Sequence, residues 1–213
     1  MSGNSRSLNF TSSDLGRDVN LLLMFEPPKN GTLYKDLFPV CWKVLKFTPS
    51  GISAARVEYT ADSGLLVPQR DTGNLVAASN AQRCQTGQMC VMETNDEGDN
   101  FLNPAVAGDP GVILCEFKTH RPSEVAFGLF NKAGNKIEPV MKWDGVGVGS
   151  TLAVQLTPKL RIYGMTDYQE TELVRGEIRS PLLFEENLIA LPNFTEWIVS
   201  IDPASNAIKI NRS

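Results

Sequence analysis

Short apolar segments separated by turn-forming residues run through most of this 213-residue chain. Ala55, Val57 and Tyr59 alternate with polar neighbours, a pattern typical of a strand with one face in water. Two other segments, 40–47 and 112–117, are mostly apolar, as strands buried on both faces are. The chain is therefore expected to be mainly β-sheet.

The connections between these segments carry the residues that chain reversals need. Gly, Pro, Asn or Asp occur at 48–51, 132–135 and 202–206, where they supply backbone freedom or a fixed φ. Successive short hairpins favour antiparallel pairing, and many strands with turn signals favour a sandwich or barrel. No linker or repeat divides the chain. We therefore expect one β domain over 19–213, preceded by a loose N-terminal arm over 1–18 that is rich in Ser, Asn and Gly, with docking at a sheet edge as the alternative for this arm.

One segment favours a helix. Ser180 can cap a helix and Pro181 suits its first position, where a missing N–H costs nothing. The predicted fold is thus all-β with minor α content: a single-domain antiparallel β-sandwich or barrel with one short helix near 181–191.

Charge and hydropathy limit the partners and the compartment. The net charge is −4 and the basic residues are scattered, so no nucleic-acid partner is expected. The longest apolar run, 21–25, is far too short to span a bilayer, and it lacks the surroundings of a signal peptide. No transmembrane segment is expected, and the predicted localisation is cytoplasmic. The cysteines, Cys41, Cys84, Cys90 and Cys115, are then expected to be reduced thiols, although Cys84 and Cys90 could close a loop on oxidation.

Familiar catalytic and cofactor patterns do not fit this chain. The single histidine, His120, excludes sites that need several imidazoles, and the cysteines lack zinc spacing. The glycines of 145–149 precede a strand candidate rather than a helix, so they do not predict a phosphate loop. The acidic stretch 93–104 resembles a calcium loop only in its first half. No cofactor and no metal are expected.

Three loops have the composition of a ligand site. The first loop, 95–100, offers carboxylate and amide oxygens; the second, 143–149, offers an aromatic ring beside a carboxylate; and the third, 163–172, offers a tyrosine among acidic residues. If they converge at one end of the sandwich, a rigid sheet would present them together. The candidate ligand-binding residues are Asn95, Asp96, Asp99, Trp143, Asp144, Asp167 and Tyr168, with packing in the core as the alternative for Trp143.

The function expected from this pattern is non-catalytic binding, lectin-like in general character, with a small-molecule or carbohydrate ligand. An enzyme that uses carboxylate or tyrosine acid/base groups, as a hydrolase, lyase or isomerase, is the first alternative. A membrane-acting β protein is the second. Whether the chain forms a homo-oligomer stays open.

Overall fold

The computed structural model describes residues 5–29, 31–70, 74–164 and 167–213. The fold is all-β, as predicted. Its strands, in chain order, are β1 (Arg6–Ser13), β2 (Val19–Phe25), β3 (Leu37–Pro39), β4 (Lys43–Phe47), β5 (Ile52–Tyr59), β6 (Ser63–Arg70), β7 (Val76–Arg83), β8 (Gln88–Thr94), β9 (Asn100–Leu102), β10 (Val106–Ala107), β11 (Ile113–Lys118), β12 (Ser123–Phe130), β13 (Ile137–Val146), β14 (Thr151–Val154), β15 (Lys159–Gly164), β16 (Leu182–Asn187), β17 (Phe194–Ile201) and β18 (Ile208–Arg212).

The strands of the described residues form four open sheets. Sheet A has the order β18-β17-β1-β5, sheet B is β16-β15-β2-β4, and sheet C is β3-β13-β12-β6-β7. Sheet D is β10-β8-β11-β14, with β9 beside β8. Pairing is mostly antiparallel, but β1 with β17 and β8 with β11 are parallel. Because none of the sheets closes on itself, the architecture is of the sandwich kind rather than a barrel.

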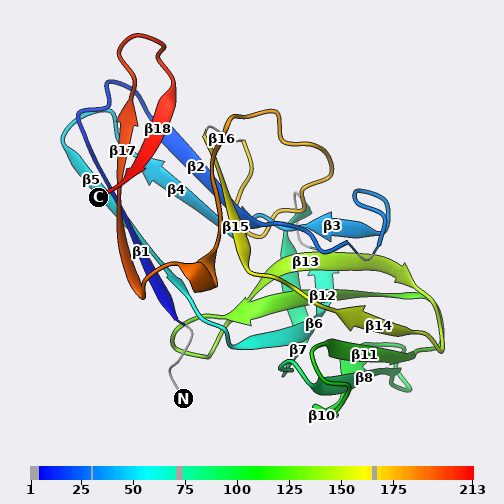
Figure 1. Ribbon diagram of the computed structural model, residues 1–213. Helices are drawn as coiled ribbons and strands as arrows, with labels where there is room; N and C mark the ends of the chain where they lie inside the picture. The colour runs from blue at the N-terminus through cyan, green and yellow to red at the C-terminus, as the bar shows by residue number, and fades with distance from the viewer. Residues whose placement is uncertain (1–4, 30, 71–73, 165–166) are drawn as a thin grey trace.

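The molecule has two halves (Figure 1). Sheets A and B occupy one half, and sheets C and D occupy the other. The chain passes between them repeatedly, since β3 lies in sheet C while β2 and β4 lie in sheet B. Residues from all four sheets, among them Leu8, Leu21, Leu65 and Cys90, belong to one contiguous apolar core. That 19–213 forms a single domain remains a prediction.

Residues 6–13 are neither a loose arm nor a strand docked at a sheet edge, because β1 lies between β17 and β5 in sheet A. Residues 6–13 form β1, which pairs with β17 on one side and with β5 on the other. Leu8 and Phe10 face the core, and the Phe10 ring stacks on Trp197 at 6.1 Å. The buried Arg6 guanidinium donates to the Leu188 and Ile189 carbonyls at 2.8 and 2.9 Å. Residues 1–4 of the arm lie outside the described residues.

The expected helix near 181–191 is also wrong. The segment forms the edge strand β16, followed by a single 3-10 turn over Leu188–Ala190. Phe184 pairs with Ile162 of β15, and its ring packs edge-on against Trp197 at 4.7 Å. Pairing with β15 supplies both hydrogen bonds and ring packing, and these tertiary contacts outweigh a weak local helix preference.

Candidate functional site

The first predicted loop is an exposed turn between β8 and β9. The Asn95 side-chain oxygen accepts hydrogen bonds from the backbone N–H groups of Glu97 and Asp99, at 3.1 and 2.8 Å. This oxygen therefore shapes the turn itself. The side chains of Asp96 and Asp99 are exposed at the tip.

The second predicted loop does not offer its aromatic ring. Trp143 lies within β13, is 3% exposed and belongs to the core. The expectation that Trp143 packs in the core is confirmed, and its place among the candidate ligand-binding residues is wrong because the ring is buried. Asp144 is the partner of Lys142, a fully buried lysine that also pairs with Glu124 at 3.0 Å. A buried ammonium needs such partners, so Asp144 has a structural role.

The first two loops lie near each other, and the third lies elsewhere. The Asn100 amide donates to Ser123 Oγ at 2.9 Å, and Ser123 is the ladder partner of Val146. The turn after β8 thus meets the end of β13 in the half with sheets C and D. Asp167 and Tyr168, in contrast, line a cavity with Asn20 of β2 in the other half. The structure does not gather the seven residues in one site.

The hollow beside Tyr168 is larger than that loop alone. Two cavities of about 390 and 480 Å³ adjoin each other, since both are lined by Glu177, Ile178 and Ser180. Together they have the size of a small-molecule site. We call the two cavities together the tyrosine cleft. The residues that line it include Asp18, Asn20, Met24, Tyr34, Arg161, Tyr163, Asp167, Tyr168, Glu177, Ile178 and Arg179.

The floor of the tyrosine cleft is the outer face of sheet B. Strand β2 is apolar on both faces: Leu21, Leu23 and Phe25 enter the main core, while Leu22 and Met24 point the other way. An apolar outer face must be covered. Here residues of 167–181 cover it, with Val174 packed among Leu22, Met24 and Cys41, and with Tyr168 and Ile178 alongside.

Backbone hydrogen bonds hold this covering segment in place. Thr171 N–H donates to the Cys41 carbonyl at 2.8 Å, and Cys41 N–H donates to the Glu172 carbonyl at 2.9 Å. Val174 N–H then donates to the Pro39 carbonyl at 2.8 Å. Leu173 packs on the outer face of sheet C, whereas Val174 packs on sheet B. One segment therefore covers both halves and fixes the wall that carries Tyr168.

Tyr34 reaches the cleft from a strained turn. Its φ of +63° lies in the left-handed region, which a bulky side chain rarely adopts. The turn is held by hydrogen bonds to the Thr32 carbonyl from the N–H groups of Lys35, Asp36 and Leu37. A residue in this region costs of order 1–3 kcal/mol, and such strain is concentrated at functional sites.

Three of the four tyrosines of the chain meet in this cleft. Burial raises the pKa of Tyr34, Tyr163 and Tyr168, and Glu177 raises those of Tyr34 and Tyr163 further. The phenols therefore stay protonated at neutral pH. Each can donate a hydrogen bond and offer a ring face, which is what amphipathic tyrosines contribute to binding sites.

An ion-pair network fixes the wall beside β15. Arg161 contacts Glu26 and Glu185 at 2.6 and 2.5 Å, and Lys159 contacts Glu185 at 2.6 Å and Glu26 at 3.5 Å. Hydrogen bonds from Lys159 and Arg161 lower the pKa of Glu185. The guanidinium that lines the cleft is thus held in one position between two strands.

The described residues contain no group of three or more His, Cys, Asp or Glu side chains arranged to hold a metal ion. Nor does the described part of the chain contain a helix long and apolar enough to cross a membrane. Comparison with protein-family models, with curated proteins and with solved structures finds no match to this chain.

Sequence reasoning found Asp167 and Tyr168 but missed most of the cleft. Tyr34 is far in sequence from Tyr163 and Glu177, and the pairing of β2 with β15 brings the chain that follows β2 to the same side of the molecule as Tyr163. The one local signal was the placement of Tyr163 and Tyr168 around the short stretch that follows β15.

Proposed function

We propose that the protein binds a neutral, hydroxylated ligand of the saccharide class in the tyrosine cleft and releases it unchanged. The observation that carries this proposal is the convergence of Tyr34, Tyr163 and Tyr168, with raised pKa values, in two adjoining cavities. Tyrosine rings can pack on the apolar C–H face of a sugar, while their protonated hydroxyls donate to its oxygens.

The other polar groups of the cleft fit the same class of ligand. Asp18, Asp167 and Glu177 supply acceptors for ligand hydroxyls, and Arg161 and Arg179 supply donors. The lining has three carboxylates and two guanidiniums, and one of these, Arg161, is already paired with Glu26 and Glu185, so the cleft disfavours an anionic ligand. A few polar groups around aromatic and aliphatic side chains are usual for small-molecule sites.

The tyrosines support binding over acid/base catalysis. A phenol that acts as a general base must lose its proton near the working pH. Burial instead raises the pKa of all three tyrosines, so they keep their protons at neutral pH. They are suited to hydrogen bonding and stacking, not to proton abstraction.

Saturation-transfer NMR with neutral saccharides tests the proposal. The probes are glucose, galactose, mannose, xylose, N-acetylglucosamine and their short β-linked oligomers. At least one should receive saturation from the protein, and Tyr34→Ala should weaken its binding by more than about 1 kcal/mol, as truncation of an aromatic side chain that anchors a partner does. Tyr34→Phe should lose only the share that the hydroxyl contributes, about 0.5–1.5 kcal/mol.

The matched control is Phe194→Ala, which removes a half-exposed ring from the outer face of sheet A. Binding should be unchanged in this variant. The proposal fails if none of the saccharides binds, or if both alanine variants lose affinity equally. Conversion of a bound saccharide during the experiment would instead favour the enzyme alternative.

A further inference from the structure

A separate cavity of about 220 Å³ lies at the junction between the two halves of the molecule. Its walls come from β5 of sheet A, β12 of sheet C, β11 and β14 of sheet D, and the turn after β16 of sheet B. It shares no lining residue with the tyrosine cleft. We call it the junction cavity. Ligand sites occur preferentially where separate packing units meet, so this position makes it a candidate for a second binding site.

The floor of the junction cavity is apolar and uncharged. The buried residues that line it, each no more than 5% exposed, include Tyr59, Ile113, Phe127, Leu129 and Val154. The described residues that line the cavity include no Asp, Glu, Lys, Arg or His. A charged group placed there would lose its hydration without gaining a partner. The lining therefore suits a neutral and largely apolar ligand, in contrast to the tyrosine cleft with its carboxylates and guanidiniums.

One polar group of this lining has no hydrogen-bond partner in the described part of the chain. It is the hydroxyl of Tyr59, a residue that is only 5% exposed. Packing against Phe25, with ring centroids 6.2 Å apart, holds the Tyr59 ring in place. Burial raises the pKa of Tyr59, so the phenol keeps its proton at neutral pH and can donate it. A buried phenol usually finds an acceptor, and an oxygen atom of a bound ligand would supply one.

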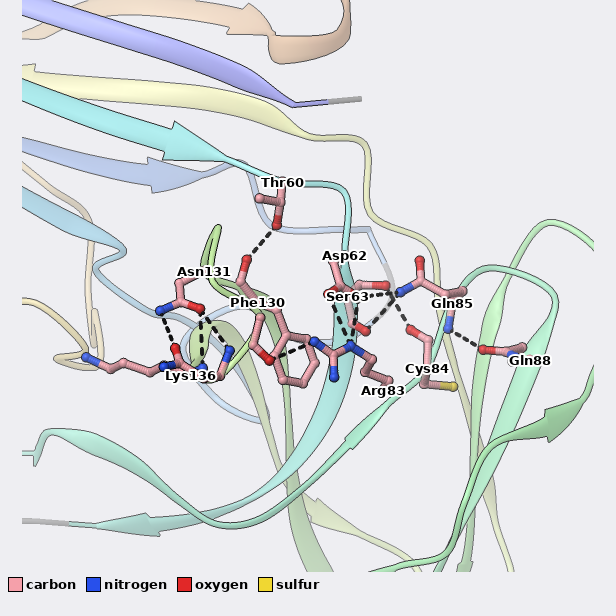
Figure 2. A network of polar contacts seen from close by, with 12 residues as sticks. Thr60, Asp62, Ser63, Arg83, Cys84, Gln85, Gln88, Phe130, Asn131 and Lys136 are labelled. Carbon is pink, nitrogen blue, oxygen red and sulfur yellow. Dashed lines mark hydrogen bonds and ion pairs between the residues drawn. The ribbon is translucent and has the colours of Figure 1, made fainter. Parts of the chain in front are cut away.

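Polar contacts fix one wall of the junction cavity before any ligand binds. Figure 2 shows this wall, where the link between β5 and β6 meets the link between β7 and β8. Ser63 lines the cavity, and its Oγ donates to the Cys84 carbonyl at 2.8 Å. Next to it, Gln85 Nε2 donates to Asp62 Oδ1 at 3.1 Å. A site whose walls are already in place avoids part of the ordering cost of binding.

We propose that the junction cavity binds a neutral monocyclic ligand with one hydrogen-bond acceptor, which the Tyr59 hydroxyl recognises. An apolar cavity of about 150 Å³ can hold benzene, so about 220 Å³ leaves room for one ring with a short substituent. The cavity is open to solvent through the exposed residues of its lining, which are Ala61, Thr86, Gly111, Gln155 and Ile189. This inference goes beyond the proposed saccharide binding and does not depend on it.

The test is a titration of the isotope-labelled whole chain with two probes of the same shape, followed through the backbone amide shifts by heteronuclear NMR. Acetophenone carries a carbonyl oxygen, and α-methylstyrene has a methylene group in its place. Both should bind, because both can fill the apolar floor. The amide shifts should be largest around the junction cavity, at Thr86, Gly111 and Ile189. Shifts centred on the tyrosine cleft, or no saturable shifts with either probe, would overturn the proposal.

Tyr59→Phe removes the donor and keeps the ring. It should weaken acetophenone binding about 2- to 12-fold, the share of one hydrogen bond, and leave the affinity for α-methylstyrene unchanged. The matched control, Tyr34→Phe, removes a hydroxyl from the tyrosine cleft and should change neither affinity. If Tyr59→Phe weakens the binding of both probes equally, or of neither, the hydroxyl does not recognise the acceptor and the proposal is wrong. If this variant does not fold, the map of amide shifts on the unmodified chain still decides whether the junction cavity binds the probes.

Discussion

Sheets A and B pack against each other, yet their outer faces differ completely. On sheet A, β1 sends Leu8 and Phe10 inward and leaves Asn9 and Thr11 outside, and that outer face stays open to solvent. On sheet B, β2 is buried on both sides, and the segment 167–181 lies over it. The covered face is the one that carries the tyrosine cleft.

This difference shows how the cleft arises. A strand with strict alternation needs only one partner layer, so nothing has to lie on its other side. An apolar second face requires a cover, and an irregular cover leaves hollows where it does not fit closely. The cleft is such a hollow, bordered by the strained turn of Tyr34 and by Tyr168 of the cover. The packing requirement of one strand thus places aromatic and ionic groups around a cavity.

The largest expected effect contrasts a buried leucine on the covered face with a threonine on the open face. Leu22 is 0% exposed beneath the cover, and Leu22→Ala should lower the free energy of unfolding by about 2–5 kcal/mol. Thr11→Ala, on the outer face of sheet A, should change it by no more than about 0.5 kcal/mol. Urea titration measures both. Equal losses would mean that the two outer faces do not differ in packing.

A smaller effect is expected from a hydroxyl placed under the cover. Val174 is fully buried against sheet B, and Val174→Thr keeps its shape but buries a polar group. The expected loss is about 1–3 kcal/mol. The matched change on the open face is Ile198→Thr, at a side chain that is 49% exposed, and it should be nearly neutral. A neutral Val174→Thr would show that the cover admits water over sheet B.

The same contrast explains what could be predicted from the sequence. The apolar segments 40–47 and 112–117 were expected to be buried on both faces, and that expectation is wrong: β4 leaves Lys46 exposed, and β11 alternates buried with less buried residues. The strand that is buried on both faces is β2, which contains the longest apolar run, 21–25. The alternation of Leu8 and Phe10 was present too, but the Ser and Asn residues around them suggested a loose arm. The segment 182–187 has no strong period of its own, and its pairing with β15 decides its structure. The cleft depends on the pairing of β2 with β15 and on where 167–181 returns, and no local pattern encodes either.

The smallest expected effect concerns the charged edge of sheet B. Glu185 has a pKa lowered by Lys159 and Arg161, so its ionised form is favoured in the folded protein. A group with a lowered folded pKa stabilises the protein above its unfolded pKa, and this contribution is lost as the pH falls through the folded value. The Glu185 side chain is 28% exposed on an edge strand, so solvent screening limits the effect to about 1 kcal/mol or less.

Glu185→Gln should therefore lower the melting temperature slightly at pH 7 and match the unchanged protein at low pH, where the carboxylate is protonated in both the folded and unfolded states. The two curves should converge as the pH falls below about 4.5, the ordinary range for glutamate. Glu186→Gln removes one carboxylate from the adjacent position of β16 and serves as the matched control. The melting temperature of Glu186→Gln at pH 7 should differ less from that of the unchanged protein than the melting temperature of Glu185→Gln does. If the melting temperatures of both variants fall equally, the loss comes from the change in net charge. The ion pairs of Glu185 with Lys159 and Arg161 would then contribute nothing measurable to stability.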